Sequence, residues 1–97
     1  MTKTTKIFNS IEEIGKYYKV QSNTYIFEED DVYIDLVIFN FDLKVNATID
    51  AIDIRAGNIE AMNILACDII AYSIECDNII ADKVIANRVN AGVNIGK

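Results

Sequence analysis

The chain contains no histidine, no proline and no tryptophan among its 97 residues. Without histidine it lacks the usual general base and the commonest metal ligand. Its two cysteines, Cys67 and Cys76, are too few and too scattered for a zinc site or a disulfide framework. The four glycines form no phosphate-binding loop. We therefore expect a protein that is not an enzyme and that has no catalytic residue, no metal site and no cofactor.

Long hydrophobic runs are also missing. No run reaches the roughly 18 apolar residues of a membrane span, and the start of the chain does not have the pattern of a signal peptide. We expect a single cytoplasmic domain with no membrane contact. Proline, which has no backbone N–H, is absent, so every residue of the chain can donate to a ladder of backbone hydrogen bonds.

The most regular feature of the sequence is a branched aliphatic residue at every fifth position. This series comprises Ile49, Ile54, Ile59, Ile64, Ile69, Ile74, Ile79, Val84 and Val89. A series of small residues follows it two positions later: Ala51, Ala56, Ala61, Ala66, Ala71, Cys76, Ala81, Ala86 and Ala91.

A period of five fits neither a straight helix nor a straight strand. Five steps of about 100° would wind the aliphatic residues around every side of a helix. In a strand, an odd period would send successive residues to opposite faces. The chain must therefore turn a corner every five residues. Four corners would close a square coil of about twenty residues, and stacked coils would form a solenoid with a dry aliphatic interior.

The repeats read NATID-AIDIR-AGNIE-AMNIL-ACDII-AYSIE-CDNII-ADKVI-ANRVN-AGVNI. They resemble the pentapeptide-repeat proteins, in which Asp or Asn also often precedes the large aliphatic residue. They depart from that family in one respect: the small residue lies two positions after the large one, not two before it. The resemblance implies an all-β fold, a right-handed quadrilateral β-helix. Some members of the family mimic DNA and inhibit topoisomerases.

The N-terminal part lacks the clean period, and we expect two units: a cap over residues 1–31 and the solenoid over 32–97. A helix is predicted from Ser10 to Lys19, with Ser10 and Glu13 as a capping box. Its apolar face would comprise Ile11, Ile14 and Tyr18.

An acidic stretch, Glu28–Asp31, should form the turn of a hairpin-like pair of strands, without the glycine that favours a tight primed turn. Residues 32–45 have two interpretations. They could form a first coil of the solenoid in which large side chains, among them Phe39 and Phe41, fill the open end of the core, or an ordinary strand rich in β-branched and aromatic residues.

The chain is acidic, with a formal net charge of −6. Residues 46–97 carry seven acidic and four basic side chains, a net charge of −3. Two and a half coils would be about 12 Å long, and duplex DNA of that length carries about seven charges. The solenoid alone is therefore weakly charged for a mimic of DNA. Mimicry would need the N-terminal acidic stretch to align with it, or a dimer to lengthen the rod.

The leading functional hypothesis is a non-catalytic inhibitor of a basic nucleic-acid-handling host protein, such as gyrase or a CRISPR nuclease, encoded by a phage. It would not bind nucleic acid directly. The expected contact residues are Glu28, Glu29, Asp30, Asp31, Asp50, Asp53, Glu75 and Asp77. A carboxylate pair among Asp50, Asp53, Glu75 and Asp77 is the one catalytic alternative, and solvated turn positions are the simpler interpretation. A structural or assembly module is the alternative function.

Outward apolar residues twenty positions apart should stack, in particular Leu65 with Ile85 and Ile52 with Tyr72. Either the N-terminal helix or a partner would cover them. The C-terminal end of the solenoid has no evident cap, so we expect a homodimer through residues 80–97. Its interface would contain Val84, Val89, Val93 and Ile95.

Overall fold

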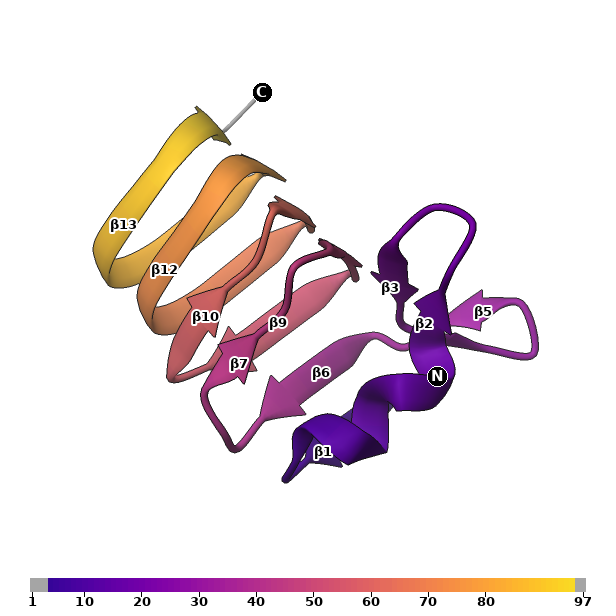
Figure 1. Ribbon diagram of the computed structural model, residues 1–97. Coiled ribbons are helices and arrows are strands. Elements are labelled where there is room, and N and C mark those ends of the chain that lie inside the picture. The colour runs from indigo at the N-terminus through magenta and orange to yellow at the C-terminus, as the bar shows by residue number, and fades with distance from the viewer. Residues whose placement is uncertain (1–3, 96–97) are drawn as a thin grey trace.

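The computed structural model describes residues 4–95, and the side chains of residues 4–91. The chain forms an all-β solenoid with one short 3₁₀ helix and an N-terminal cap (Figure 1). The cap contains β1 (Thr5–Phe8), η1 (Ile11–Tyr17), β2 (Tyr18–Lys19), β3 (Thr24–Ile26), β4 (Glu28–Glu29) and β5 (Val32–Tyr33). The solenoid contains β6 (Leu36–Phe39), β7 (Leu43–Lys44), β8 (Thr48–Asp50), β9 (Asp53–Ala56), β10 (Asn58–Glu60), β11 (Asn63–Leu65), β12 (Asp68–Ala81) and β13 (Lys83–Ile95).

The coils of the solenoid are three-sided. Ile64 pairs in parallel with Ile49 and with Ile79, so the strands above and below it are fifteen residues away in the chain. Side 1 consists of β6, β9 and the first parts of β12 and β13. Side 2 consists of β7, β10 and the middle parts of β12 and β13. Side 3 consists of β8, β11 and the last parts of β12 and β13.

This geometry confirms the all-β solenoid with a corner every five residues and corrects the number of corners. The expected quadrilateral coil of twenty residues is wrong, because a period of five fixes the length of a side but not the number of sides. Three isoleucines and three small residues fill the triangular interior. Ile54, Ile59 and Ile64, one from each side, are at most 2% exposed.

The interior is apolar throughout the described residues, with no buried polar or charged side chain among them. Cys76 takes an inward alanine position and is buried, whereas Cys67 lies at an outward corner and is exposed. Both thiols are free. The small residue at each corner lets the backbone turn tightly around the aliphatic columns.

The solenoid begins with a coil that contains β6 and β7, as one of the two interpretations of residues 32–45 predicted, and this coil is wider than the others. Val37 pairs with Ile54, seventeen residues on, and Leu43 pairs with Ile59, sixteen residues on. Phe39 lies beside Ala56 rather than in an isoleucine column, so the five-residue period of the aliphatic residues does not extend back to Phe39. The extra residues make room for aromatic rings, among them the packed pair Phe27 and Phe39, 5.5 Å apart.

The cap closes the N-terminal end of the solenoid. β1 pairs with β6 and β3 pairs with β8, both in parallel. The helix η1 buries Ile14 and Tyr17 but leaves Ile11 and Tyr18 exposed. The predicted apolar face is therefore partly wrong, because the helix is 3₁₀ and its buried positions are three residues apart. Ser10 makes no side-chain capping bond, although Glu13 accepts a hydrogen bond from the backbone N–H of Asn9.

The acidic stretch forms a tight hairpin between β4 and β5. Its two turn residues, Asp30 and Asp31, have positive φ values of 53° and 63°. Positive φ at both central positions is the requirement of a type I′ turn, and Asp tolerates it better than most residues. The acidic stretch therefore forms a tight primed turn although it contains no glycine.

Substitutions at the neighbours Ile69 and Ile70 test whether side chains alternate between the interior and the surface along a strand. Ile69 is fully buried, whereas Ile70 is 43% exposed and lies beside Arg55. We expect Ile69→Asp to lower the free energy of unfolding by more than about 4 kcal/mol, because an unpaired charge enters an apolar core. Ile70→Asp should cost less than about 1 kcal/mol. Denaturant titration followed by circular dichroism measures both, and equal losses would contradict this side-chain alternation.

A substitution at Gly15 tests the conformation of the helix η1. A Cβ atom at this position would have no neighbouring atom within 4 Å. Alanine loses less backbone entropy than glycine when a helix forms. We expect Gly15→Ala to raise the free energy of unfolding by about 0.5 to 1 kcal/mol. A destabilised variant in the same denaturant titration would mean that the backbone at this position is not helical.

Candidate functional site

The second side of the solenoid carries a column of acidic side chains. Glu60 and Glu75 are paired neighbours on successive coils, and both point outward and are exposed. Asp77 follows at the next corner, and a surface groove is lined by all three carboxylates. Among the described residues the only ion pairs are those of Glu29, so this acidic column has none. Like charges that face each other across two strands destabilise a sheet. Lys44 is the other paired neighbour of Glu60 but forms no ion pair with it, so the two carboxylates can meet an external cationic group.

The structure separates most of the predicted contact residues. Glu75 and Asp77 share side 2 and its corner, but Asp53 lies on side 1 and Asp50 lies on side 3. Asp50 also accepts a hydrogen bond of 2.9 Å from the Tyr33 hydroxyl. Only two of the four predicted solenoid acids therefore belong to one surface. The paired-carboxylate alternative loses its geometric basis for the residues on different sides.

Sequence reasoning missed Glu60, which completes the acidic column. The signal was present, because Glu60 and Glu75 are fifteen residues apart and both directly follow an inward isoleucine. With a coil of twenty residues they would have lain on different sides.

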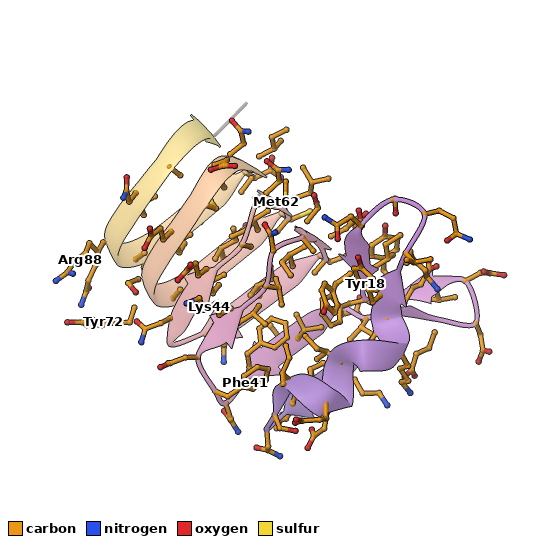
Figure 2. The ribbon with its side chains drawn as sticks, viewed as in Figure 1. Tyr18, Phe41, Lys44, Met62, Tyr72 and Arg88 are labelled. Carbon is orange, nitrogen blue, oxygen red and sulfur yellow. The ribbon has the colours of Figure 1, made fainter. Side chains whose placement is uncertain are left out.

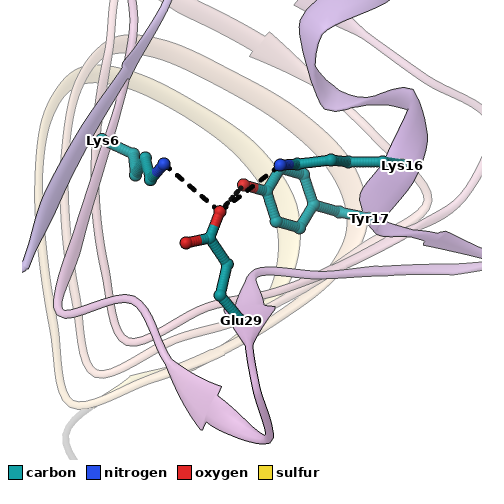
Figure 3. A network of polar contacts seen from close by, with 4 residues as sticks. All are labelled: Lys6, Lys16, Tyr17 and Glu29. Atoms are coloured by element: carbon teal, nitrogen blue, oxygen red, sulfur yellow. Dashed lines mark hydrogen bonds and ion pairs between the residues drawn. The ribbon is translucent and has the colours of Figure 1, made fainter.

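The four acids of the hairpin have different environments. Glu29 accepts a hydrogen bond of 2.7 Å from the Tyr17 hydroxyl and pairs with Lys6 and Lys16 at 3.3 and 3.5 Å (Figure 3). The Tyr17 hydrogen bond, followed by the hydrogen bond with Lys6, lowers the pKa of Glu29 below its ordinary value. Glu29 therefore joins β1, η1 and the hairpin. Asp30 and Asp31 at the tip remain exposed.

Two tyrosines of the cap and hairpin hold their protons strongly. Desolvation, and after it the neighbouring Glu29, raises the pKa of Tyr17 to about 12. Desolvation and the hydrogen bond to Asp50 raise the pKa of Tyr33 to about 12. The Tyr17 ring is buried against Phe8 and Phe27, and the Tyr33 hydroxyl joins the hairpin to Asp50 of β8.

These shifts predict a loss of stability in base. Between the ordinary tyrosine pKa of 10.0 and about 12, the unfolded chain loses protons that the folded chain keeps. The free energy of unfolding should therefore fall as pH rises through this window. In the double variant Tyr17→Phe/Tyr33→Phe, the free energy of unfolding should fall much less steeply with pH in this window. Denaturant titrations at several pH values measure it, and identical slopes in the two proteins would contradict the assignment.

Two further columns are chains of polar side chains joined by hydrogen bonds. On side 3, Asn78 donates to Asn63 and Asn63 donates to Thr48, at 3.1 and 3.2 Å. On side 2, Ser73 donates to Asn58 at 2.6 Å, and Asn58 donates to the carboxylate of Asp42 at 3.0 Å. Arg88 is the next residue above Ser73. This second column, named the Asp42–Arg88 column below, thus begins with an anion and ends with a cation.

The outward apolar residues form columns different from those expected. Leu65 lies beside Ile80, and Ile70 beside Ile85, because neighbours are fifteen residues apart and not twenty. Tyr72 lies above Gly57, to which its backbone N–H donates a hydrogen bond of 2.7 Å. Figure 2 shows Tyr72 and Arg88 on the same edge of the solenoid, both pointing away from it.

The helix η1 does not cover these columns, since it packs on β1 and β3 at the N-terminal end. Ile80 and Ile85 are 54% and 51% exposed. The interpretation in which the helix folds back over the columns is therefore wrong.

The C-terminal coil leaves its core partly open. Val89 is 38% exposed, whereas Ile74 directly below it is 2% exposed. Val84 is half-buried, and among the described strands β13 pairs only with β12. The backbones of Val93 and Ile95 continue the same rung, but their side chains lie outside the described ones.

Comparison of the chain with protein-family models, with curated proteins and with solved structures gave no match. Within residues 4–95 no three His, Cys, Asp or Glu side chains are grouped to hold a metal ion. In the same part of the chain, no helix has the length and apolar character needed to cross a membrane. The acidic column, the Asp42–Arg88 column and the open C-terminal coil are the features that a function can use.

Proposed function

We propose that the protein is a non-catalytic, acidic interaction protein that occupies the basic groove of a nucleic-acid-handling protein. The observation that carries this proposal is the acidic column, in which Glu60 and Glu75 are stacked without an ion pair. We also propose that the chain is a three-sided relative of the pentapeptide-repeat proteins. The corner at every fifth residue supports this relation, and the coil of fifteen residues distinguishes the chain from the four-sided members.

The charge of side 2 supports an electrostatic contact there. Side 2 and its corner carry four acidic and two basic side chains, which gives a net charge of −2. The acidic residues are Asp42, Glu60, Glu75 and Asp77, and the basic residues are Lys44 and Arg88. Side 1 carries two of each sign, a net charge of zero, from Asp53, Asp68, Arg55 and Lys83. Neighbouring rungs are about 4.8 Å apart, so the acidic column can replace only a few phosphates. Because the contact would join exposed charges, added salt should weaken it.

Charge reversal on two sides tests this proposal with matched variants. Glu60→Lys/Glu75→Lys and Asp53→Lys/Asp68→Lys change the net charge equally, on side 2 and side 1 respectively. We expect the side 2 variant to lose at least about tenfold in inhibition of the target, because repulsion replaces attraction. The side 1 variant should stay within about threefold of wild type, since only the long-range field changes.

The measurement is the binding of DNA or guide RNA by purified targets, beginning with gyrase and a CRISPR nuclease, at two salt concentrations. Equal losses in the two variants would show that only net charge matters. An inhibition that neither variant changes would remove the acidic column from the contact.

A second candidate function is assembly, and the open C-terminal coil favours it. In this proposal two copies bury their last coils against each other as a homodimer through residues 80–97. Each β13 would pair with its counterpart, and Val84 and Val89 would close the two cores. The exposed columns Leu65–Ile80 and Ile70–Ile85 would offer further apolar contacts.

Light scattering tests the homodimer. We expect twice the chain mass for the wild type at micromolar concentration and the single mass for Val89→Arg, which places a charge in the contact. Tyr72→Arg, which adds the same charge at an exposed corner, is the control and should remain dimeric. A monomeric wild type would exclude this interface.

A further inference from the structure

We propose that the N-terminal cap covers a docking surface for the C-terminal coil of a second copy of this chain. In the wild type the cap then stops the solenoids from stacking head to tail. This inference uses the open C-terminal coil described above, but it needs neither the homodimer nor the acidic contact.

The cap occupies the place of an additional rung. β1 lies along β6 with the pairs Thr5↔Leu36 to Phe8↔Phe39, and β3 lies along β8 with Tyr25↔Ile49 at its centre. Both pairings are parallel, as are all pairings between successive coils. On side 2, β7 pairs only with β10 among the described strands. The cap therefore completes two of the three sides of a rung, on edges that another coil would also fit (Figure 1).

The two ends of the solenoid match in the positions of their inward residues. One inward column runs from Val37 through Ile54 and Ile69 to Val84. Another runs from Leu43 through Ile59 and Ile74 to Val89. If β13 of one copy replaced the cap of the next, Val84 would lie against Val37 and Val89 against Leu43. Each inward column would then continue from copy to copy.

The outward charges also match in this arrangement. The Asp42–Arg88 column begins at the capped end with a carboxylate and ends at the open end with a guanidinium. Head-to-tail stacking would bring Arg88 of one copy against Asp42 of the next. Ile85 would likewise meet Ile38, which begins its column on side 1. Two C-terminal coils facing each other would instead bring together the two bases of each, Lys83 and Arg88. Charge complementarity therefore identifies the occupant as the opposite end of another copy.

Aromatic packing holds the cap in place. The ring of Phe8 lies 5.6 Å from Tyr17 and 5.8 Å from Phe27, and Tyr17 and Phe27 are 5.1 Å apart. Glu29 ties β1 and η1 to the hairpin through Lys6 and Tyr17. Because the backbone bonds of the cap strands would be replaced by equivalent bonds to β13, loss of these aromatic contacts should be sufficient to allow the exchange.

The test begins with Phe8→Ala and continues to Phe8→Ala/Tyr17→Ala if the single substitution does not open the cap. Faster cleavage by trypsin at Lys16 and Lys19 marks an opened cap. Circular dichroism must retain the β signal of the solenoid. In sedimentation velocity the opened variant should form species larger than a dimer whose size grows with concentration. The wild type should not exceed a dimer. An opened cap with wild-type mass would overturn the inference.

Second substitutions in the opened variant establish the register of the contact. Val89→Arg should abolish the large species, whereas unspecific aggregation through exposed aromatic rings would persist and contradict the inference. Arg88→Glu should raise the concentration for half assembly about tenfold, and adding Asp42→Arg should restore it, because the charge pair is re-formed in reverse. A failure of Asp42→Arg to restore assembly would overturn the head-to-tail register. The wild-type mass separately decides the homodimer.

Discussion

The register of fifteen residues between neighbouring strands is the constraint on which the rest of the structure depends. It places inward side chains of the same kind directly above one another, so that Ile49, Ile64 and Ile79 form one continuous inward column. The same register stacks outward residues, and the surface becomes a set of columns rather than a mosaic. Burial of the inward columns stabilises the fold, while the outward columns differ in chemistry and include the acidic pair Glu60–Glu75 and the apolar pair Leu65–Ile80. Stability and recognition thus derive from a single repeat.

The sequence predicted the corners of the coil but not their number. The five-residue period of isoleucine and alanine requires a turn after each short strand, and this requirement was met. A triangle and a square of the same side length have the same period, however, and only the pairing of distant strands distinguishes them. The error propagated to the surface, where Leu65 was placed beside Ile85 instead of Ile80. The first coil was harder still, because Phe39 and its aromatic neighbours widen it and remove the period.

The candidate site shows the same limit. Glu75 and Asp77 were identified from charge alone, and Glu60 was missed because its position above or below Glu75 depends on the coil length. Glu29 was assigned to a partner contact although it binds Tyr17, Lys6 and Lys16. Such contacts join segments that no periodicity relates, so the sequence pattern cannot reveal them. The cap illustrates the point further, because β1 and β3 act as a substitute rung without sharing the repeat.

The coil length can be measured directly by disulfide formation between outward positions. In a background of Cys67→Ser and Cys76→Ala, the pair Leu65→Cys/Ile80→Cys is fifteen residues apart and lies on adjacent strands. Adjacent strands are about 4.8 Å apart, within the range that a disulfide spans. The pair Leu65→Cys/Ile85→Cys is twenty residues apart and lies on different sides. A three-sided solenoid predicts rapid intramolecular oxidation of the first pair alone. Rapid oxidation of the second pair alone would contradict it.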